Sequence, residues 1–311
     1  MAGFATERII ATHPLGFASL AVSPDGQSAC FDRDGKISVI DLATGKETEI
    51  GTGAHPAWTP SGTILVADNR RIVELTPGQR STEPKVVVPQ SLVWNGQPTA
   101  PSSNGKTMAC TVEGLPYPGD KRRTVSAFAL IESNVAKRLD IECYYGRAIV
   151  TSDNAFALLV SWGAIQGRLV ILDMKTGAVL LDTPGRLPAV SPDGARVAYI
   201  GEHRLFIASI ADLRRDPPVS PKDCVIGEAS RRTARLSMNK PLWLDDETVL
   251  FENGGRVFAP DKGFAAKELG TFDGLSSRGI PSWDLNRGTR DIIFEREKPD
   301  GTFELCVATM D

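Results

Sequence analysis

Short apolar runs alternate with polar turns along almost the whole chain of 311 residues. The clearest case starts at residues 189–194 (AVSPDG) and continues through an apolar run at 197–200, a polar turn at 201–204 and a second apolar run at 205–208. Short apolar runs bounded by Gly, Pro, Asp and Ser are typical of β-strands joined by tight turns. The pattern therefore predicts an all-β protein.

The AVSPDG segment has a second full copy at residues 21–26, and degenerate copies occupy the intervals. In this turn Pro sets φ, Asp caps the backbone locally and Gly takes a positive φ, so its Asp residues are expected to be structural. The seven copies end at residues 26, 62, 105, 154, 194, 247 and 287. Their mean spacing of about 43 residues is the period of a propeller blade. We therefore predict one domain, residues 1–311, folded as a single seven-bladed β-propeller.

The two ends of the chain predict how this propeller closes. The residues after 287 suffice for the second and third strands of the last blade, at 292–295 and 303–308, but not for a fourth. Residues 7–11 form a spare strand ahead of the first complete blade. We expect this N-terminal strand to complete the C-terminal blade, because a closed architecture leaves no exposed sheet edge.

The repeat resembles the TolB-type, WD-like propeller repeat. The residues that carry the resemblance are Ser191-Pro192-Asp193-Gly194, followed by the strands at 197–199 and 205–207. The resemblance extends over nearly the whole chain, although only two of the seven copies keep the full motif and there is no room for the additional N-terminal domain of TolB. It implies a propeller fold and protein partners, and it brings no catalytic residue with it.

Composition narrows the class of protein further. The formal charge of −3 lacks the electrostatic footprint of a general nucleic-acid-binding protein. No run approaches the ~18 apolar residues that span a bilayer, so no membrane partner is expected. The first residues do not form a secretory signal, which predicts a cytoplasmic protein, or a periplasmic or secreted one if a signal peptide has been removed. The five scattered cysteines are expected to be free structural thiols.

The candidate ligand site follows from the propeller resemblance. In a propeller, the residues that precede each first strand gather around the channel mouth on one face. Several of these residues are basic, and a concave basic mouth could hold a carboxylate, a phosphate or an acidic peptide. Acidic residues in the same loops keep a second interpretation open, in which these loops are simply solvated. The predicted ligand-binding residues are Arg147, Arg186, Lys240, Arg278, His55, Gln97, Tyr145 and Trp94.

Two further groups of residues complete the candidate surface. Residues 113–123 and 212–239 depart most from the repeat and are predicted to be long loops, where binding residues concentrate. Trp58, Trp243 and Trp283 recur at one position of the blade, which predicts packing between blades. Trp94 and Trp162 stand beside loops and are the better candidates for contact with a ligand.

The sequence favours a binding protein over an enzyme. The chain contains no G-x-S-x-G motif, which excludes a serine hydrolase of the propeller-bearing kind. His13 and His55 are weak candidates for a metal site, because no HxH or HxxxH spacing supports them. We predict a non-catalytic binding or scaffold propeller without a cofactor, which recognises an acidic small molecule or a peptide or protein segment on its channel face. The alternative is a propeller enzyme, a metal-dependent lyase or hydrolase that uses the same mouth.

Overall fold

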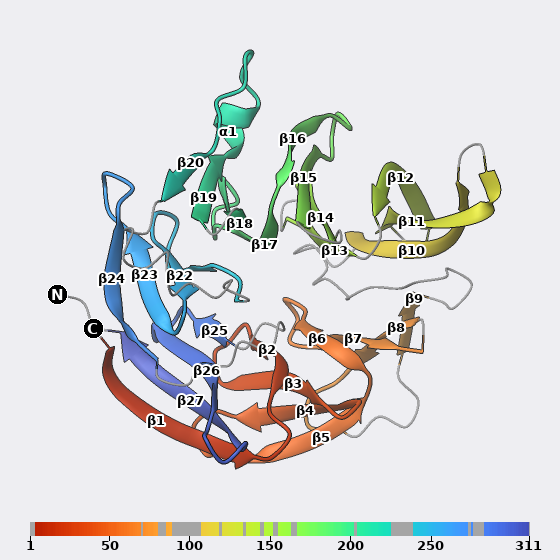
Figure 1. Ribbon diagram of the computed structural model, residues 1–311. Helices are drawn as coiled ribbons and strands as arrows, with labels where there is room; N and C mark the ends of the chain where they lie inside the picture. Colours follow the sequence, from red (N-terminus) through yellow and green to blue (C-terminus); the bar gives the residue numbers. More distant parts are fainter. Residues whose placement is uncertain are drawn as a thin grey trace. The chain divides into compact units, whose positions relative to one another are not determined.

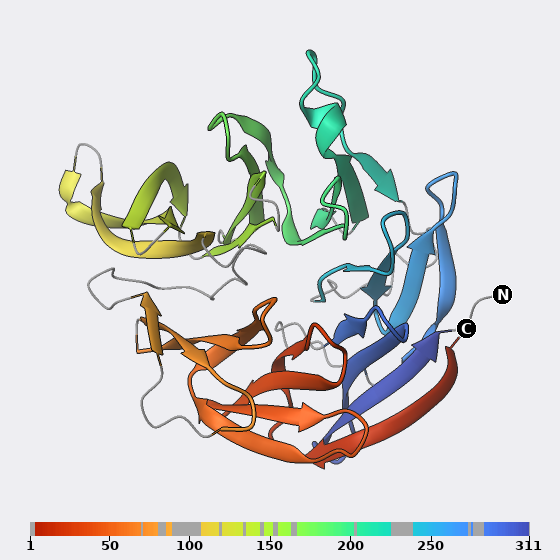
Figure 2. The ribbon, with the colours of Figure 1, turned by 180° about the vertical axis from the view of Figure 1, so that it is seen from behind.

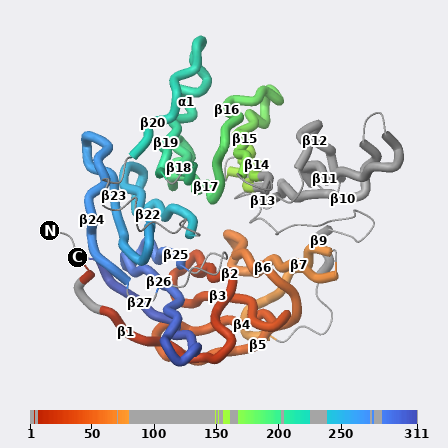
Figure 3. Tube along the Cα trace, in the orientation of Figure 1, coloured from red at the N-terminus to blue at the C-terminus, as the bar shows by residue number. Residues whose placement is uncertain are grey.

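The computed structural model shows an almost entirely β protein (Figure 1). It describes residues 4–69, 71–79, 85–88, 107–117, 120–132, 135–143, 146–151, 155–162, 167–201, 204–224, 239–272, 275 and 283–310. Within these residues the one helix is α1 (Ile210–Leu213), a single turn that follows a strand. Figure 3 follows the Cα trace from the red N-terminal strand to the blue C-terminal one.

The chain divides into two compact units. The first unit comprises residues 1–34, 40–47 and 187–311, and the second comprises residues 35–39 and 48–186. One four-stranded sheet contributes residues to both units, in the order β2 (Ala18–Val22), β3 (Ser28–Arg33), β4 (Lys36–Asp41) and β5 (Glu47–Thr52).

The first unit holds three further four-stranded sheets. One runs in the order β17 (Arg186–Val190), β18 (Arg196–Gly201), β19 (Arg204–Ser209) and β20 (Lys222–Cys224), with Arg186 assigned to the second unit. The next contains β21 (Leu242–Trp243), β22 (Val249–Asn253), β23 (Arg256–Pro260) and β24 (Ala266–Thr271). The third has the order β25 (Trp283–Asn286), β26 (Asp291–Glu297), β27 (Phe303–Met310) and β1 (Phe4–His13).

The second unit holds two four-stranded sheets and one with three strands. The four-stranded sheets are β6 (Ala54–Trp58), β7 (Ile64–Asp68), β8 (Arg71–Leu75) and β9 (Lys85–Val88), and β13 (Gly146–Val150), β14 (Phe156–Trp162), β15 (Gly167–Asp173) and β16 (Val179–Pro184). The three-stranded sheet consists of β10 (Thr107–Tyr117), β11 (Asp120–Glu132) and β12 (Val135–Cys143).

The prediction of seven blades is therefore wrong, since the described residues form six four-stranded blades. The third repeat departs from the pattern because its strands are long: β10 has 11 residues, β11 has 13 and β12 has 9. Residues 113–117 and 120–123 were expected to be a loop, but they belong to β10 and β11, which form a hairpin with Leu115 opposite Val125 and Tyr117 opposite Asp120.

The prediction for the N-terminal strand is confirmed. β1 pairs antiparallel with β27 along its whole length, from Phe4 opposite Met310 to His13 opposite Phe303. The two strands run side by side in the view from behind, red beside blue (Figure 2). Ile10 and Ala11 of β1 pack on a buried cluster that includes Phe303 and Leu305. The N-terminal strand thus covers both an edge and part of the core of the last sheet.

The SPDG turns connect first and second strands as predicted. In the turn at 191–194, the amide of Gly194 donates to the carbonyl of Ser191 at 2.9 Å, and Gly194 has φ of 73°. The turn at 23–26 repeats this geometry, with Gly26 donating to Ser23 at 2.9 Å and a φ of 71°. A Cβ on Gly26 would also come within 2.4 Å of the Asn286 amide group, so only glycine fits this position.

Two of the three repeated tryptophans pack between sheets of the first unit. Trp243 is 2% exposed and packs with Ala198, Ile200 and Leu205 of the preceding sheet. Its Nε1 donates to the carbonyl oxygen of Ala189 in β17 at 3.0 Å. The prediction that Trp243 packs between blades is thereby confirmed, and Trp283, fully buried, makes the equivalent bond one sheet further along.

Candidate functional site

The first strands carry a repeated backbone distortion at the predicted site. The second residue of β2, β6 and β17 has a positive φ in each case: 53° at Ser19, 53° at His55 and 52° at Leu187. The pairing register also shifts within β2 and β6. Non-glycine residues adopt this conformation at an energetic cost. Register shifts of this kind are β-bulges, which change the direction of side chains and are common next to functional sites. His55 is therefore held in a specific, strained conformation.

Arg186, the first residue of β17, is the best-defined of the predicted ligand-binding residues. It is half-buried, and burial lowers the pKa of its guanidinium. The backbone beside it is tightly packed, because Gly185 donates to the carbonyl of Gly167 at 2.8 Å. A Cβ on Gly167 would lie 2.7 Å from the Gly185 oxygen and 3.2 Å from the Arg186 Cβ. The second unit thus holds the backbone of this arginine in place.

Lys240 precedes β21 and already forms an ion pair. Its Nζ lies 2.9 Å from Oδ1 of Asp284 in β25, and the other oxygen of Asp284 accepts a hydrogen bond from the amide of Val22 at 2.9 Å. This carboxylate neutralises the ammonium group, so an external anion would have to compete with Asp284. The structure gives Lys240 a role in joining neighbouring strands of the first unit.

The other predicted residues are only partly visible in the structure. Arg147 is the second residue of β13, where it pairs with Val160, but its side chain lies outside what the structure describes. The remaining four predicted residues lie outside the described residues: Trp94, Gln97, Tyr145 and Arg278. Of the two aromatic candidates, Trp162 ends β14 and pairs with Gly167.

The candidate metal residues occupy different positions in their sheets. His13 ends β1, the outermost strand in its sheet order, whereas His55 lies in a first strand. Nδ1 of His13 accepts a hydrogen bond from the amide of Leu15 at 3.0 Å, and burial together with the nearby charge of Arg33 lowers the pKa of His13. In the described part of the chain, no three His, Cys, Asp or Glu side chains form a group that could hold a metal ion.

Sequence reasoning missed two buried carboxylates near the starts of first strands. Glu252 is 6% exposed, and its two oxygens accept hydrogen bonds from the Asn239 amide group at 3.2 Å and the Gly255 backbone at 2.7 Å. Glu295 is 3% exposed and accepts a hydrogen bond from the amide of Phe17, which precedes β2. A Phe-Glu pair near the end of the second strand is the sequence signal they share. These acids hold the segments that precede first strands.

A groove of about 590 Å³ opens at the opposite ends of the strands in the first unit. It lies between the sheets β17–β20 and β21–β24, beside the turns that join first to second and third to fourth strands. Ile207, Val219 and Trp243 contribute apolar surface, and Arg196, Lys222 and Lys262 contribute basic groups. The ligand site predicted from the sequence lies at the other ends of these strands, and this groove was not predicted.

Comparison with solved structures places the fold. The chain resembles the β-propeller domain of Cps50 (Swd1) from Myceliophteria thermophila, with a TM-score of 0.63 and 12% identity over 98% of this chain and 99% of that one. It resembles the Dos1 propeller with a TM-score of 0.56 and 11% identity over 92% and 77% of the two chains. A putative TolB from Agrobacterium tumefaciens gives 0.50 and 17% identity over 97% and 93%.

These likenesses and the described sheets define the class: the protein has a β-propeller fold. The resemblance of the repeats to TolB-type and WD-like propellers is supported at the level of the fold. No protein-family model matches the chain, and no curated protein sequence matches it. In the residues that the structure covers, no helix is long and apolar enough to cross a membrane.

Proposed function

We propose that the protein is a non-catalytic binding or scaffold propeller that recognises an acidic small molecule or an acidic peptide or protein segment beside its first strands. The observation that carries this proposal is the half-buried, backbone-anchored Arg186. A partly desolvated guanidinium attracts an anion more strongly than one in bulk water, and its planar fork can hold a carboxylate or phosphate through two hydrogen bonds. Arg147, in the first strand of the preceding sheet, is the proposed second basic group.

The contribution of each predicted residue differs under this proposal. Arg186 provides the main charge, and His55, whose backbone has a φ of 53°, provides an additional contact. Lys240 contributes less to the ligand, because Asp284 already neutralises it. Gln97, Tyr145, Trp94 and Arg278 complete the proposed set.

The test uses the full-length protein with a panel of citrate, inorganic phosphate and hexaglutamate. Binding is measured by calorimetry and by the shift in melting temperature, at low and at high salt. We expect at least one probe to bind and to stabilise the protein, with Arg186→Ala weakening that binding more than Arg186→Lys. Salt should weaken binding to the wild type, since charge attraction supplies much of it.

Arg168→Ala is the matched control. Arg168 lies in the same unit, and its guanidinium already pairs with Asp182 through bonds of 2.8 and 2.6 Å, so its loss should leave binding unchanged. Equal affinity of the wild type and Arg186→Ala for the bound probe, or no binding of any probe, would contradict the proposal. So would a stoichiometric divalent cation in the purified protein that is lost in His55→Ala, because that result favours the metal-dependent enzyme.

A further inference from the structure

The groove between the sheets β17–β20 and β21–β24 is the open end of a buried apolar layer. Trp243 packs in the cluster between these two sheets with Phe251 and Phe258, and Ile207 packs against the same cluster. Both Ile207 and Trp243 also line the groove. Val219 adds an aliphatic side chain that is 42% exposed, one of the few large apolar residues so exposed among those described. The groove thus presents an apolar floor to solvent.

Phe264 lines this groove in a backbone conformation that favours glycine. Its φ is 62°. Three of the turns between third and fourth strands close with a hydrogen bond from the amide of their first Asp to a carbonyl further along, and in each the residue just before that carbonyl has a positive φ. That residue is Gly45 in the turn from Asp41, Gly177 in the turn from Asp173 and Phe264 in the turn from Asp261. The turn from Asp261 is one residue shorter than the other two.

Gly45 and Gly177 adopt φ values of 70° and 74° without strain, because glycine lacks a Cβ. Phe264 adopts the same conformation with a large side chain, although Gly263 is next to it in the chain. A bulky residue in this region is a true outlier, and such strain persists where the side chain has a use. The ring of Phe264 lies at the groove, 4.9 Å from Nζ of Lys222 in the neighbouring sheet.

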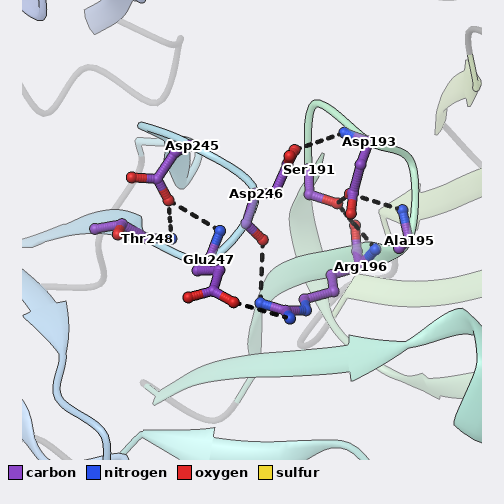
Figure 4. Close-up of polar contacts among 8 residues, drawn as sticks. All are labelled: Ser191, Asp193, Ala195, Arg196, Asp245, Asp246, Glu247 and Thr248. Atoms are coloured by element: carbon purple, nitrogen blue, oxygen red, sulfur yellow. Dashed lines mark hydrogen bonds and ion pairs between the residues drawn. The ribbon is translucent and has the colours of Figure 1, made fainter.

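Two turns beside the groove are joined by hydrogen bonds to each other and within themselves (Figure 4). The amide of Asp193 donates to Oδ1 of Asp246 at 2.8 Å, and Arg196 donates to the carbonyl oxygen of Asp246 at 3.1 Å. In the facing turn, Asp245 accepts from the amides of Glu247 and Thr248 at 2.9 and 2.6 Å. A site whose walls are ordered before binding loses little conformational entropy when a ligand binds.

Among the charged residues that line the groove, the acids have partners, whereas two lysines form no ion pair with a described residue. Each of the three acids that line it has a partner: Asp212 pairs with Arg215 at 3.1 Å, Asp261 accepts from two backbone amides, and Glu247 lies 4.0 Å from Arg196. Lys222 and Lys262, in contrast, make no ion pair with any residue that the structure describes. An apolar floor with two ammonium groups that no described acid neutralises is complementary to an anionic group attached to an apolar one.

We propose that this groove binds a short segment of a partner protein in which an acidic residue stands next to a large apolar residue. The apolar side chain lies on the floor formed by Ile207, Trp243 and Val219, beside the ring of Phe264, and the carboxylate lies between Lys222 and Lys262. This surface is at the opposite ends of the strands from Arg186, so the two proposals are independent.

A displayed library of random peptides, selected against the immobilised full-length protein, tests the proposal. Enriched peptides are then labelled and titrated by fluorescence polarisation. We expect them to carry Asp or Glu close to Leu, Phe or Trp, and replacement of the acid by Ala to weaken binding about tenfold. Phe264→Gly should weaken binding about tenfold or more without lowering the melting temperature, because it removes the ring and relieves the strain. Lys222→Glu should abolish the preference for acids.

Lys175→Glu is the matched control for Lys262→Glu, because both lysines lie in turns between third and fourth strands. The Lys262 variant should weaken binding, and the Lys175 variant should leave it unchanged. Arg186→Ala should also bind the selected peptides normally, which separates this site from the one proposed above. No enrichment over the bare surface, enrichment of peptides without acids, or unchanged binding to both Phe264→Gly and Lys222→Glu would each overturn the proposal.

Discussion

Trp283 donates a hydrogen bond from Nε1 to the carbonyl oxygen of Lys240 at 2.7 Å, and so ties β25 to the residue that leads into β21. The side chain of Lys240 returns to the same sheet, where it pairs with Asp284 at 2.9 Å. Trp243 bonds to Ala189 in the same way at 3.0 Å. A recurrent residue at one position of the repeat therefore joins successive sheets of the first unit.

Trp283→Phe should lower the free energy of unfolding by about 1–3 kcal/mol, because the Lys240 carbonyl loses its donor and the smaller ring leaves space in a buried site. Trp243→Phe should have an effect of similar size. Urea denaturation followed by circular dichroism measures both. The substitution Leu15→Ala, at a residue that is 57% exposed, serves as the control and should change stability little. Unchanged stability in Trp283→Phe would mean that this bond is dispensable.

Removal of residues 1–13 should destabilise the protein and promote its aggregation. The truncation exposes the whole edge of β27, together with apolar surface that Ile10 and Ala11 cover, and an uncovered edge strand pairs with other chains. It also removes Glu7, which pairs with Arg296. Size-exclusion chromatography and thermal denaturation measure the outcome. Removal of residues 1–3 alone is the control, and a monomeric, equally stable truncated protein would contradict the expectation.

Stability should fall as the pH drops below about 4. A hydrogen bond from the Ser23 hydroxyl lowers the pKa of Asp25, and one from the Ser191 hydroxyl lowers the pKa of Asp193. Hydrogen bonds from the amide and hydroxyl of Thr44 lower the pKa of Asp41. A carboxylate with a lowered folded-state pKa stabilises the protein fully above its unfolded pKa of 3.8. That contribution is lost as the pH falls through the folded-state pKa values.

Urea denaturation between pH 6 and pH 2.5 measures this dependence. The double variant Asp25→Asn/Asp193→Asn should show a smaller loss of stability in acid, because its two turns no longer gain a proton on unfolding at low pH. Identical pH dependence in the variant and the wild type would show that these turns do not contribute.

Gly177→Phe should lower the free energy of unfolding by about 1–2 kcal/mol, the usual cost of placing a residue with a Cβ in the left-handed region. No atom of the described residues lies within 4 Å of a Cβ built at Gly177, so Gly177→Ala, which adds only that Cβ, should show the loss caused by backbone strain without a steric clash. The reverse change, Phe264→Gly, should leave stability equal or higher. A marked loss of stability in Phe264→Gly would show that the ring is needed for folding, and the strain would then have a structural reason.

The local parts of the fold were predictable because short-range chemistry sets them. Ser, Pro, Asp and Gly specify the turns at 23–26 and 191–194 wherever they stand, and the apolar runs at 197–200 and 205–208 become β18 and β19. The position of the spare N-terminal strand also followed from the count of strands in the last sheet. The third repeat was not predictable in this way, because the lengths of β10, β11 and β12 depend on how far the strands pair with each other.

The sequence by itself determined the strand-and-turn repeat, the positions of Trp243 and Trp283 between sheets and the pairing of β1 with β27. It placed Arg186 and Lys240 at the start of first strands. Only the tertiary structure showed that Lys240 forms an ion pair with Asp284 and that burial lowers the pKa of Arg186. The groove at Phe264 and Lys222 came from the tertiary structure alone. Its walls come from segments that are distant along the chain, and neither the φ of Phe264 nor the position of its ring beside Lys222 can be inferred from residue order.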